Sequence, residues 1–218
     1  MKHMQADKYT IAWFKIAECV SRGEKERALG VYRLLSHSFN DNAVARQLEA
    51  DIYLACNELD KAIDLYRQAM EFYQKSERFL EAAAVCEHLI TLLPNDFLLR
   101  SQLVNYYVMQ KMVSKIHDSF QIILESYIYY NEWENIAEKI IECEKNSDPF
   151  IRAMMFKQII VTVYQEEHHI DLVMIGVEKA INSFLVEGCE KNLQEFLSFL
   201  RAFDQELYEY ALNFIKIN

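Results

Sequence analysis

The sequence predicts an all-α protein of about twelve antiparallel helices, and three observations support this fold class. The 218 residues include only four Gly and two Pro, whereas folds rich in strands need many such residues at their turns. Apolar residues recur at the spacing of one helix face along most of the chain. Short polar stretches with turn and capping residues separate these apolar stretches. We therefore expect amphipathic helices joined by short turns.

Twelve stretches have this helical spacing, and the residues between them set their bounds. Pro94 stops one helix, because its ring cannot continue the helical backbone. Asn40-Asp41-Asn42 offers turn and capping residues, and Asn95-Asp96 caps the helix after Pro94. Asn146-Ser147-Asp148-Pro149 is the clearest helix start, since a capping residue precedes Pro, which favours the first helical position. The expected helices span residues 5–21, 24–36, 42–56, 60–74, 78–92, 97–109, 112–130, 132–144, 149–165, 170–186, 190–202 and 204–217.

An internal repeat underlies this row of helices. From Ala28 to Ala62 is 34 residues and from Ala62 to Ala82 is 20, which sum to a period of 54 residues or three helices. A plainer explanation is that any row of helices about 18 residues long drifts toward such spacing. The inward-facing triplets that we predict are Ala28/Tyr32/Leu35, Ala62/Tyr66/Ala69, Ala82/Cys86/Leu89, Ile116/Phe120/Ile123, Ile136/Ile140/Cys143 and Ile170/Met174/Val177.

Charge and cysteine usage narrow the class of partner. The net charge is −10 and the pI is about 5.1, and no basic stripe is visible, so we expect no nucleic-acid partner. Residues 1–10 lack the apolar core of a signal peptide, and no uncharged apolar run approaches about 18 residues, so we expect no membrane insertion. The five cysteines are widely spaced among apolar residues, which is typical of reduced, buried thiols in a cytoplasmic protein.

The stretch Leu59–Pro94 holds two helical patterns with small residues where helices would touch and aromatics between them. Over residues 43–76 the chain resembles the tetratricopeptide repeat family, whose 34-residue helix–turn–helix units have small and aromatic residues at such positions. The matching residues are Ala50, Tyr53, Ala62, Tyr66 and Ala69, joined by Trp13, Ala28 and Tyr32 in the first unit and by Tyr73, Ala82 and Pro94 in an overlapping one. Such overlap is similar to the hairpin arrays of soluble vesicle-fusion attachment proteins.

This resemblance implies a right-handed α-solenoid and one tetratricopeptide-like repeat domain over residues 1–218. Its repeats are clearer in residues 1–130, and residues 131–218 would hold divergent repeats and C-terminal capping helices. The resemblance further implies a non-enzymatic adaptor, scaffold or chaperone-like module without a cofactor, which binds a protein or peptide in its concave groove. The candidate groove residues are Trp13, Gln47, Asp51, Arg67, Glu71, Ser101, Asn105, Met155 and Ile159. Trp13 and Ala17 stand where some members of the family carry a chaperone-binding Lys and Asn.

Two of the expected helices carry more apolar surface than an ordinary surface helix. The helix over residues 149–165 is apolar on every side, which indicates either a central place in the stack or a binding surface. The last helix has one apolar stripe through Leu207 and Ala211, and a second through Tyr208, Leu212 and Ile215. Because a terminal repeat should show water a polar face, the second stripe predicts a homodimer or a docked partner.

Enzyme readings have little support in the sequence. Phosphate-cradling glycine loops and the GxSxG elbow are missing. Glu166-Glu167-His168-His169 is the one cluster that suggests a metal, and a metal-dependent hydrolase is the corresponding alternative. Adjacent His side chains point about 100° apart on a helix, so they do not share the face that a metal site on one helix requires. The four residues lie at an expected helix–helix turn, where we expect a solvated polar loop. A regulatory domain that senses a peptide is the other alternative, and we predict no metal or cofactor.

Overall fold

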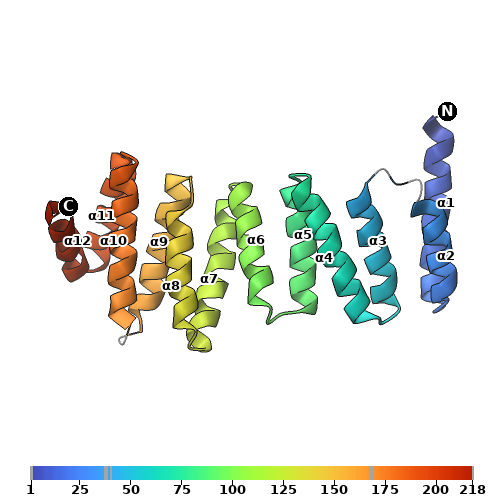
Figure 1. Ribbon diagram of the computed structural model, residues 1–218, viewed down its shortest axis with the longest axis horizontal. Coiled ribbons are helices and arrows are strands. Elements are labelled where there is room, and N and C mark those ends of the chain that lie inside the picture. Colours follow the sequence, from blue (N-terminus) through green and yellow to red (C-terminus); the bar gives the residue numbers. More distant parts are fainter. Residues whose placement is uncertain (1, 37–38, 40, 167–168, 218) are drawn as a thin grey trace. The chain divides into compact units, whose positions relative to one another are not determined.

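The computed structural model describes residues 2–36, 39, 41–166 and 169–217, and only the backbone of residues 2–10. This part of the chain consists of α-helices and contains no strand, which confirms the all-α prediction (Figure 1). The helices are α1 (Lys2–Ser21), α2 (Lys25–Ser36), α3 (Asn42–Ala55), α4 (Leu59–Lys75), α5 (Phe79–Leu92), α6 (Phe97–Met109), α7 (Val113–Tyr129), α8 (Trp133–Glu144), α9 (Pro149–Tyr164), α10 (Ile170–Val186), α11 (Glu190–Phe203) and α12 (Gln205–Ile217). The expected bounds agree to within one residue, except that α1 begins at Lys2.

The chain divides into two compact units, Met1–Tyr106 and Tyr107–Asn218. In the first unit, α1 packs on α2 and α3, and α2–α3, α3–α4 and α4–α5 are also in contact. In the second unit, every helix from α7 contacts the next helix and the one after it (Figure 1). The contacts of the second unit therefore form two layers, one of α7, α9 and α11 and the other of α8, α10 and α12. None of the helices in the described residues is long and apolar enough to cross a bilayer.

Six of the connections are the same tight turn. A residue with φ between 53° and 71° lies two positions before the next helix, and it is Gly23, Asn57, Glu77, Lys111, Asn131 or Gly188. In each turn the N–H of the following residue donates to the carbonyl five positions earlier over 2.8–3.0 Å, as from Arg78 to Tyr73. This is the Schellman closure, which satisfies the last carbonyls of a helix through one left-handed residue. The same local device thus closes the C-terminal ends of six helices.

Every third helix begins instead with an aspartate cap. The carboxylates of Asp41, Asp96, Asp148 and Asp204 accept backbone N–H groups in the first turns of α3, α6, α9 and α12 over 2.8–3.3 Å. The separations along the chain are 55, 52 and 56 residues. Each cap stabilises its helix by about 1 kcal/mol. The recurrence agrees with a three-helix period of the sequence. Asp41, Asp96 and Asp148 lie in the three stretches where the sequence predicts caps.

The predicted inward triplets are buried in five of six cases, with Leu35 half-buried. In each case the triplet starts at the fourth residue of its helix, as Ala62 does in α4. The sixth prediction is wrong, because Ile170 is 41% exposed and the buried triplet of α10 is Val173, Val177 and Ala180. The shift arises because the chain from α7 to α10 is three residues longer than the chain from α4 to α7. The third helix of the later segment, α9, has 16 residues, whereas its counterpart α6 has 13. The longer α9–α10 connection and the shorter α8 offset each other.

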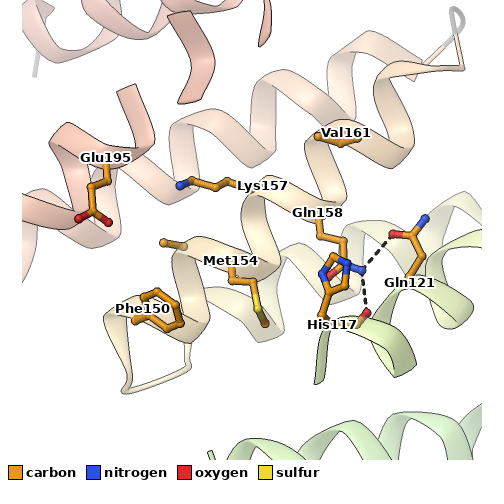
Figure 2. Close-up of a pocket in the computed structure, with 9 residues that line it drawn as sticks. His117, Gln121, Phe150, Met154, Lys157, Gln158, Val161 and Glu195 are labelled. Carbon is orange, nitrogen blue, oxygen red and sulfur yellow. Dashed lines mark hydrogen bonds between the residues drawn. The ribbon is translucent and has the colours of Figure 1, made fainter. Parts of the chain in front are cut away.

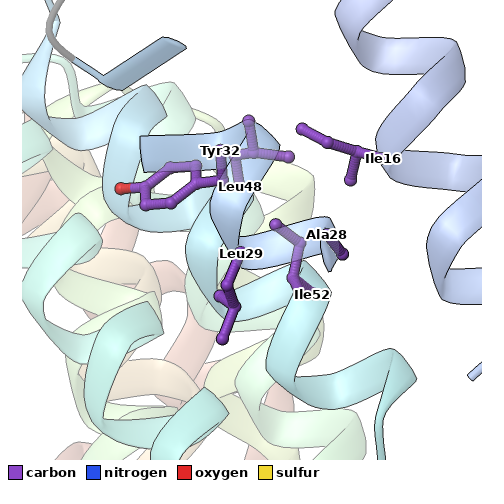
Figure 3. Close-up of a cluster of buried hydrophobic side chains, with 6 residues drawn as sticks. All are labelled: Ile16, Ala28, Leu29, Tyr32, Leu48 and Ile52. Atoms are coloured by element: carbon purple, nitrogen blue, oxygen red, sulfur yellow. The ribbon is translucent and has the colours of Figure 1, made fainter. Parts of the chain in front are cut away.

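Small and aromatic side chains form the core of the first unit where the sequence places them. Figure 3 shows one cluster in which α1, α2 and α3 meet through buried side chains. Its members are Ile16, Ala28, Leu29, Tyr32, Leu48 and Ile52. Ala62 and Ala69 of α4 are fully buried, beside the larger buried side chains of Tyr66 and Tyr73. The small residues predicted at helix contacts are thus buried in the core.

Candidate functional site

Helix α9 keeps one narrow face outside the core. Ten of its residues are buried: Ile151, Arg152, Ala153, Met155, Phe156, Gln158, Ile159, Ile160, Thr162 and Val163. Apart from the half-buried Pro149 at its start, the remaining residues are Phe150, Met154, Lys157, Val161 and Tyr164, which follow one another at intervals of four, three, four and three. This spacing puts all five side chains on one side of the helix. Phe150 is 56% exposed at one end of the stripe and Tyr164 is 36% exposed at the other.

A pocket of about 500 Å³ lies over this face of α9. We call it the α9 groove, and its lining residues are His117, Gln121, Phe150, Ala153, Met154, Lys157, Gln158, Val161 and Glu195. Figure 2 shows the side chains of α9 between Glu195 on α11 and the His117–Gln121 segment of α7. The floor is apolar, and polar groups stand on both walls. All of these residues belong to the second unit.

Hydrogen bonds fix the wall that α7 forms. The buried amide of Gln158 donates to the carbonyl oxygen of His117 at 2.8 Å and to Gln121 Oε1 at 3.0 Å (Figure 2). Thr162 also donates to Gln121 Oε1, at 3.2 Å. Gln158 Oε1 is buried without a hydrogen-bond partner among the described residues. These bonds hold α7 and α9 in register, since breaking them would leave buried polar groups unpaired.

Aromatic rings form the wall on the side of α11. Lys157 Nζ lies 5.4 Å from the centre of the Phe199 ring, which stacks on Phe203 at 5.5 Å. Phe203 in turn meets Tyr164 edge to face at 5.0 Å. The Tyr164 hydroxyl donates to Asp204 at 2.5 Å. The wall therefore runs beyond the pocket to the end of the α9 stripe, with Lys157 as the cation at its middle.

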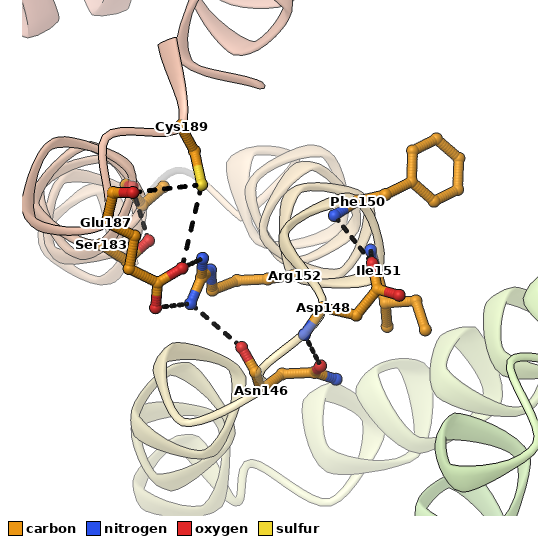
Figure 4. Close-up of polar contacts among 9 residues, drawn as sticks. Asn146, Asp148, Phe150, Ile151, Arg152, Ser183, Glu187 and Cys189 are labelled. Atoms are coloured by element: carbon orange, nitrogen blue, oxygen red, sulfur yellow. Dashed lines mark hydrogen bonds and ion pairs between the residues drawn. The ribbon is translucent and has the colours of Figure 1, made fainter. Parts of the chain in front are cut away.

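A buried arginine secures the opposite side of α9. The Arg152 side chain is 1% exposed, and it pairs with Glu187 and donates to the carbonyl of Asn146 at 3.0 Å (Figure 4). Its guanidinium also lies 5.5 Å from the centre of the Phe184 ring. The hydrogen bond from Arg152 lowers the pKa of Glu187 despite an opposing effect of burial. One side chain thus joins the α8–α9 turn, α9 and the α10–α11 turn, and it orients the groove floor.

Two residues that the sequence placed in the groove of the second unit lie in its core. Met155 is 6% exposed and Ile159 is fully buried. Met154 and Gln158, each one position earlier, line the α9 groove in their place. The apolar residues of α9 lie on every side of the helix, so the hydrophobic pattern does not show which face points outward. We therefore take Met154 and Gln158 as the groove residues of α9.

In the first unit, three of the candidate residues already have partners within the chain. Gln47 accepts the Tyr73 hydroxyl at 3.0 Å, and Asp51 accepts the Tyr66 hydroxyl at 2.5 Å. Desolvation raises the pKa of Asp51 although the hydrogen bond from Tyr66 opposes this. Arg67 pairs with the cap carboxylate of Asp96 at 3.0 Å. These contacts connect α3 with α4 and α4 with the start of α6.

The other candidate residues lie at or near the surface of their own units. Trp13 is 44% exposed on α1. Glu71 and Asn105 are exposed and Ser101 is half-buried. On α12, Tyr208, Leu212 and Ile215 are all half-buried.

The suspected metal cluster falls partly outside the described residues, which exclude Glu167 and His168. The His169 ring stacks on Trp133, with their centres 3.5 Å apart. Among the side chains described in residues 11–36, 39, 41–166 and 169–217, no three from His, Cys, Asp or Glu group as metal ligands.

The second unit is therefore an all-helical array in which the same helix–helix contacts recur along the chain. Its layer of α7, α9 and α11 carries an apolar groove. No protein-family model matches the chain, and a comparison with curated proteins finds no match.

Proposed function

We propose that this chain is a non-enzymatic protein- or peptide-binding adaptor built as a right-handed, tetratricopeptide-like α-solenoid, and that the α9 groove is its binding site. The observation that carries the proposal is the α9 stripe. A helix that is buried on all other sides keeps apolar side chains accessible along one face, between two helical walls. Accessible apolar grooves with polar rims are typical of surfaces that bind a polypeptide segment.

The chemistry of the groove suits association better than catalysis. Met154 and Val161 are already half-buried, so covering the rest of either side chain would contribute less than the roughly 1.5–3 kcal/mol of burying a fully exposed one. The Gln158 and Gln121 amides are engaged with each other, so they shape the wall and leave Lys157 and Glu195 as its charged groups. We prefer this groove to the candidate residues of the first unit, because Gln47, Asp51 and Arg67 bond to other helices of the chain or their caps, whereas the groove offers partly accessible apolar side chains. We further propose a cytoplasmic location, because all five cysteines are free.

A peptide-display selection on the purified full chain tests this function. The groove variant is Phe150→Glu, and its matched control is Ile141→Glu on α8, because the two side chains are 56% and 47% exposed. We expect the selected peptides to bind the wild type and the control but not the Phe150→Glu variant. Peptides that bind all three proteins equally would refute the groove as the binding site. Circular dichroism melts verify that both variants remain folded.

Binding through the first unit predicts a different outcome. In that case an Arg67→Ala, Asn105→Ala double variant would lose the selected peptides, and Phe150→Glu would retain them.

A further inference from the structure

We propose that the ligand of the α9 groove is an amphipathic α-helix with basic flanks, supplied by a partner protein. This inference rests on the proposed function, and it specifies the secondary structure and the charge of the bound segment. Two independent observations carry it, the spacing of the α9 stripe and the distribution of charge around it.

The spacing of the stripe matches a helix and does not match an extended strand. Phe150, Met154, Lys157, Val161 and Tyr164 alternate at intervals of four and three residues, which is the a/d pattern of two helices packed side by side. The stripe covers 14 residue steps, or about 21 Å of helix axis. A strand presents same-face side chains about 6.6 Å apart in a straight row, whereas this stripe supplies knobs and holes one helical turn apart.

The walls beside the stripe also have the geometry that a third helix needs. Both α7 and α11 contact α9, so a partner helix laid on α9 would meet a wall on each side. His117 and Gln121 are four residues apart on α7, and Glu195 stands on α11 (Figure 2). Phe150 and Tyr164 are aromatic residues at the two ends, where they can pack against the ends of the seam.

Charge determines the flanks of the partner. The second unit, residues 107–218, has 10 Lys and Arg against 18 Asp and Glu, a net of −8 out of the −10 of the whole chain. On the α7 wall, Glu125 follows Gln121 by one turn and accepts its amide at 2.8 Å. On the α11 wall stands Glu195, whose side chain is 52% exposed and forms a loose surface pair with Lys191 at 3.9 Å. Lys157 lies over the Phe199 ring, near the middle of the stripe. Basic residues on both flanks of the partner would meet these carboxylates, and the field of the unit would steer such a helix toward it.

Three labelled peptides of about 21 residues test the inference by fluorescence anisotropy on the full chain. The first has Leu at its a and d positions and Lys on its flanks, the second replaces Lys by Glu, and the third is a scrambled form of the first. We expect the Lys-flanked helix to bind at least about tenfold more tightly than either of the others. Its affinity should fall as salt rises, and its circular dichroism should become helical on binding.

Variants of the chain separate the contribution of the α9 stripe to peptide binding from the contribution of charge. Phe150→Glu should weaken binding of the Lys-flanked peptide about tenfold or more, and Ile141→Glu should leave it unchanged. Glu195→Lys should narrow the preference for Lys-flanked over Glu-flanked peptide. Equal binding of the scrambled peptide, or Glu-flanked binding as tight as Lys-flanked binding, would overturn the inference.

The two proposals fail in distinguishable ways. If the display selection yields peptides that need Phe150 but remain extended or proline-rich, the helical ligand is refuted and groove binding stands. If neither the selected peptides nor the three labelled peptides respond to Phe150→Glu, both proposals are refuted.

Discussion

Replacing Glu77 by glycine should stabilise the protein, because Glu77 closes the α4–α5 turn with φ at 57°. The left-handed region destabilises a residue with a Cβ by about 1–2 kcal/mol. Glycine removes that strain but adds freedom to the unfolded chain, which opposes folding by about 0.4–1 kcal/mol. The net expectation for Glu77→Gly is a gain of about 0.5–1 kcal/mol in the free energy of unfolding.

Two native glycines provide controls of opposite sign. Gly188 has φ at 66° and nothing within 4 Å of an added Cβ, so Gly188→Ala introduces backbone strain alone and should destabilise by about 1 kcal/mol. Gly30 lies inside α2, also with open space around an added Cβ. Gly30→Ala should therefore stabilise by about 1 kcal/mol.

Urea unfolding of the full chain, followed by circular dichroism, measures all three variants. The midpoints should rise for Glu77→Gly and Gly30→Ala and fall for Gly188→Ala, with unchanged slopes. A lower midpoint for Glu77→Gly, together with no change for Gly188→Ala, would contradict the reading of these connections as left-handed closures.

Three further predictions concern the second unit. The hydrogen bond from Tyr164, together with backbone N–H groups, lowers the pKa of Asp204. The ionised carboxylate therefore stabilises the fold fully above the unfolded pKa of about 3.9. This stabilisation is lost as the pH falls through the lower pKa of the folded state. Thermal melts should show Asp204→Asn, which retains a capping side chain, less stable than wild type at pH 7 and equal to it at strongly acidic pH; a constant difference would contradict this. Arg152→Ala should destabilise by about 2–3 kcal/mol in urea, less than a fully buried pair because Glu187 is half open to water, and Arg152→Met should lose less; equal losses would refute the packing role. If the second stripe of α12 forms a homodimer, light scattering should show half the mass for a Leu212→Glu, Ile215→Glu variant, and an unaltered mass would exclude this interface.

Local chemistry made most of the helix bounds predictable from the sequence. Asp148-Pro149 has both a capping carboxylate and a residue suited to the first turn, and α9 begins there. The left-handed positions were only partly visible. Gly23 and Asn57 are residues that favour positive φ, whereas Glu77 and Lys111 carry no such preference and adopt it at the same left-handed closure of a helix end.

Tertiary packing decided what the sequence did not reveal about the site. The apolar pattern of α9 surrounds the helix, so the choice between Met154 and Met155 as the outer residue depends on where α7 and α11 lie. The position of the α10 triplet likewise depends on the length of α9, which shifts it from Ile170 to Val173. The pairing of Arg67 with Asp96 joins residues 29 positions apart, and no local pattern announces it.

Site-specific photocrosslinking in cells tests the central claim most directly, which is that a partner occupies the α9 groove. A photoreactive phenylalanine analogue at position 154 would lie in the lining of the groove. The same analogue at position 141 would lie outside the groove, at an exposed position of α8. We predict a discrete crosslinked partner band from position 154, which disappears when Phe150→Glu is added, and no such band from position 141. Equal crosslinking from both positions, or a band from position 154 that persists with Phe150→Glu, would contradict the account.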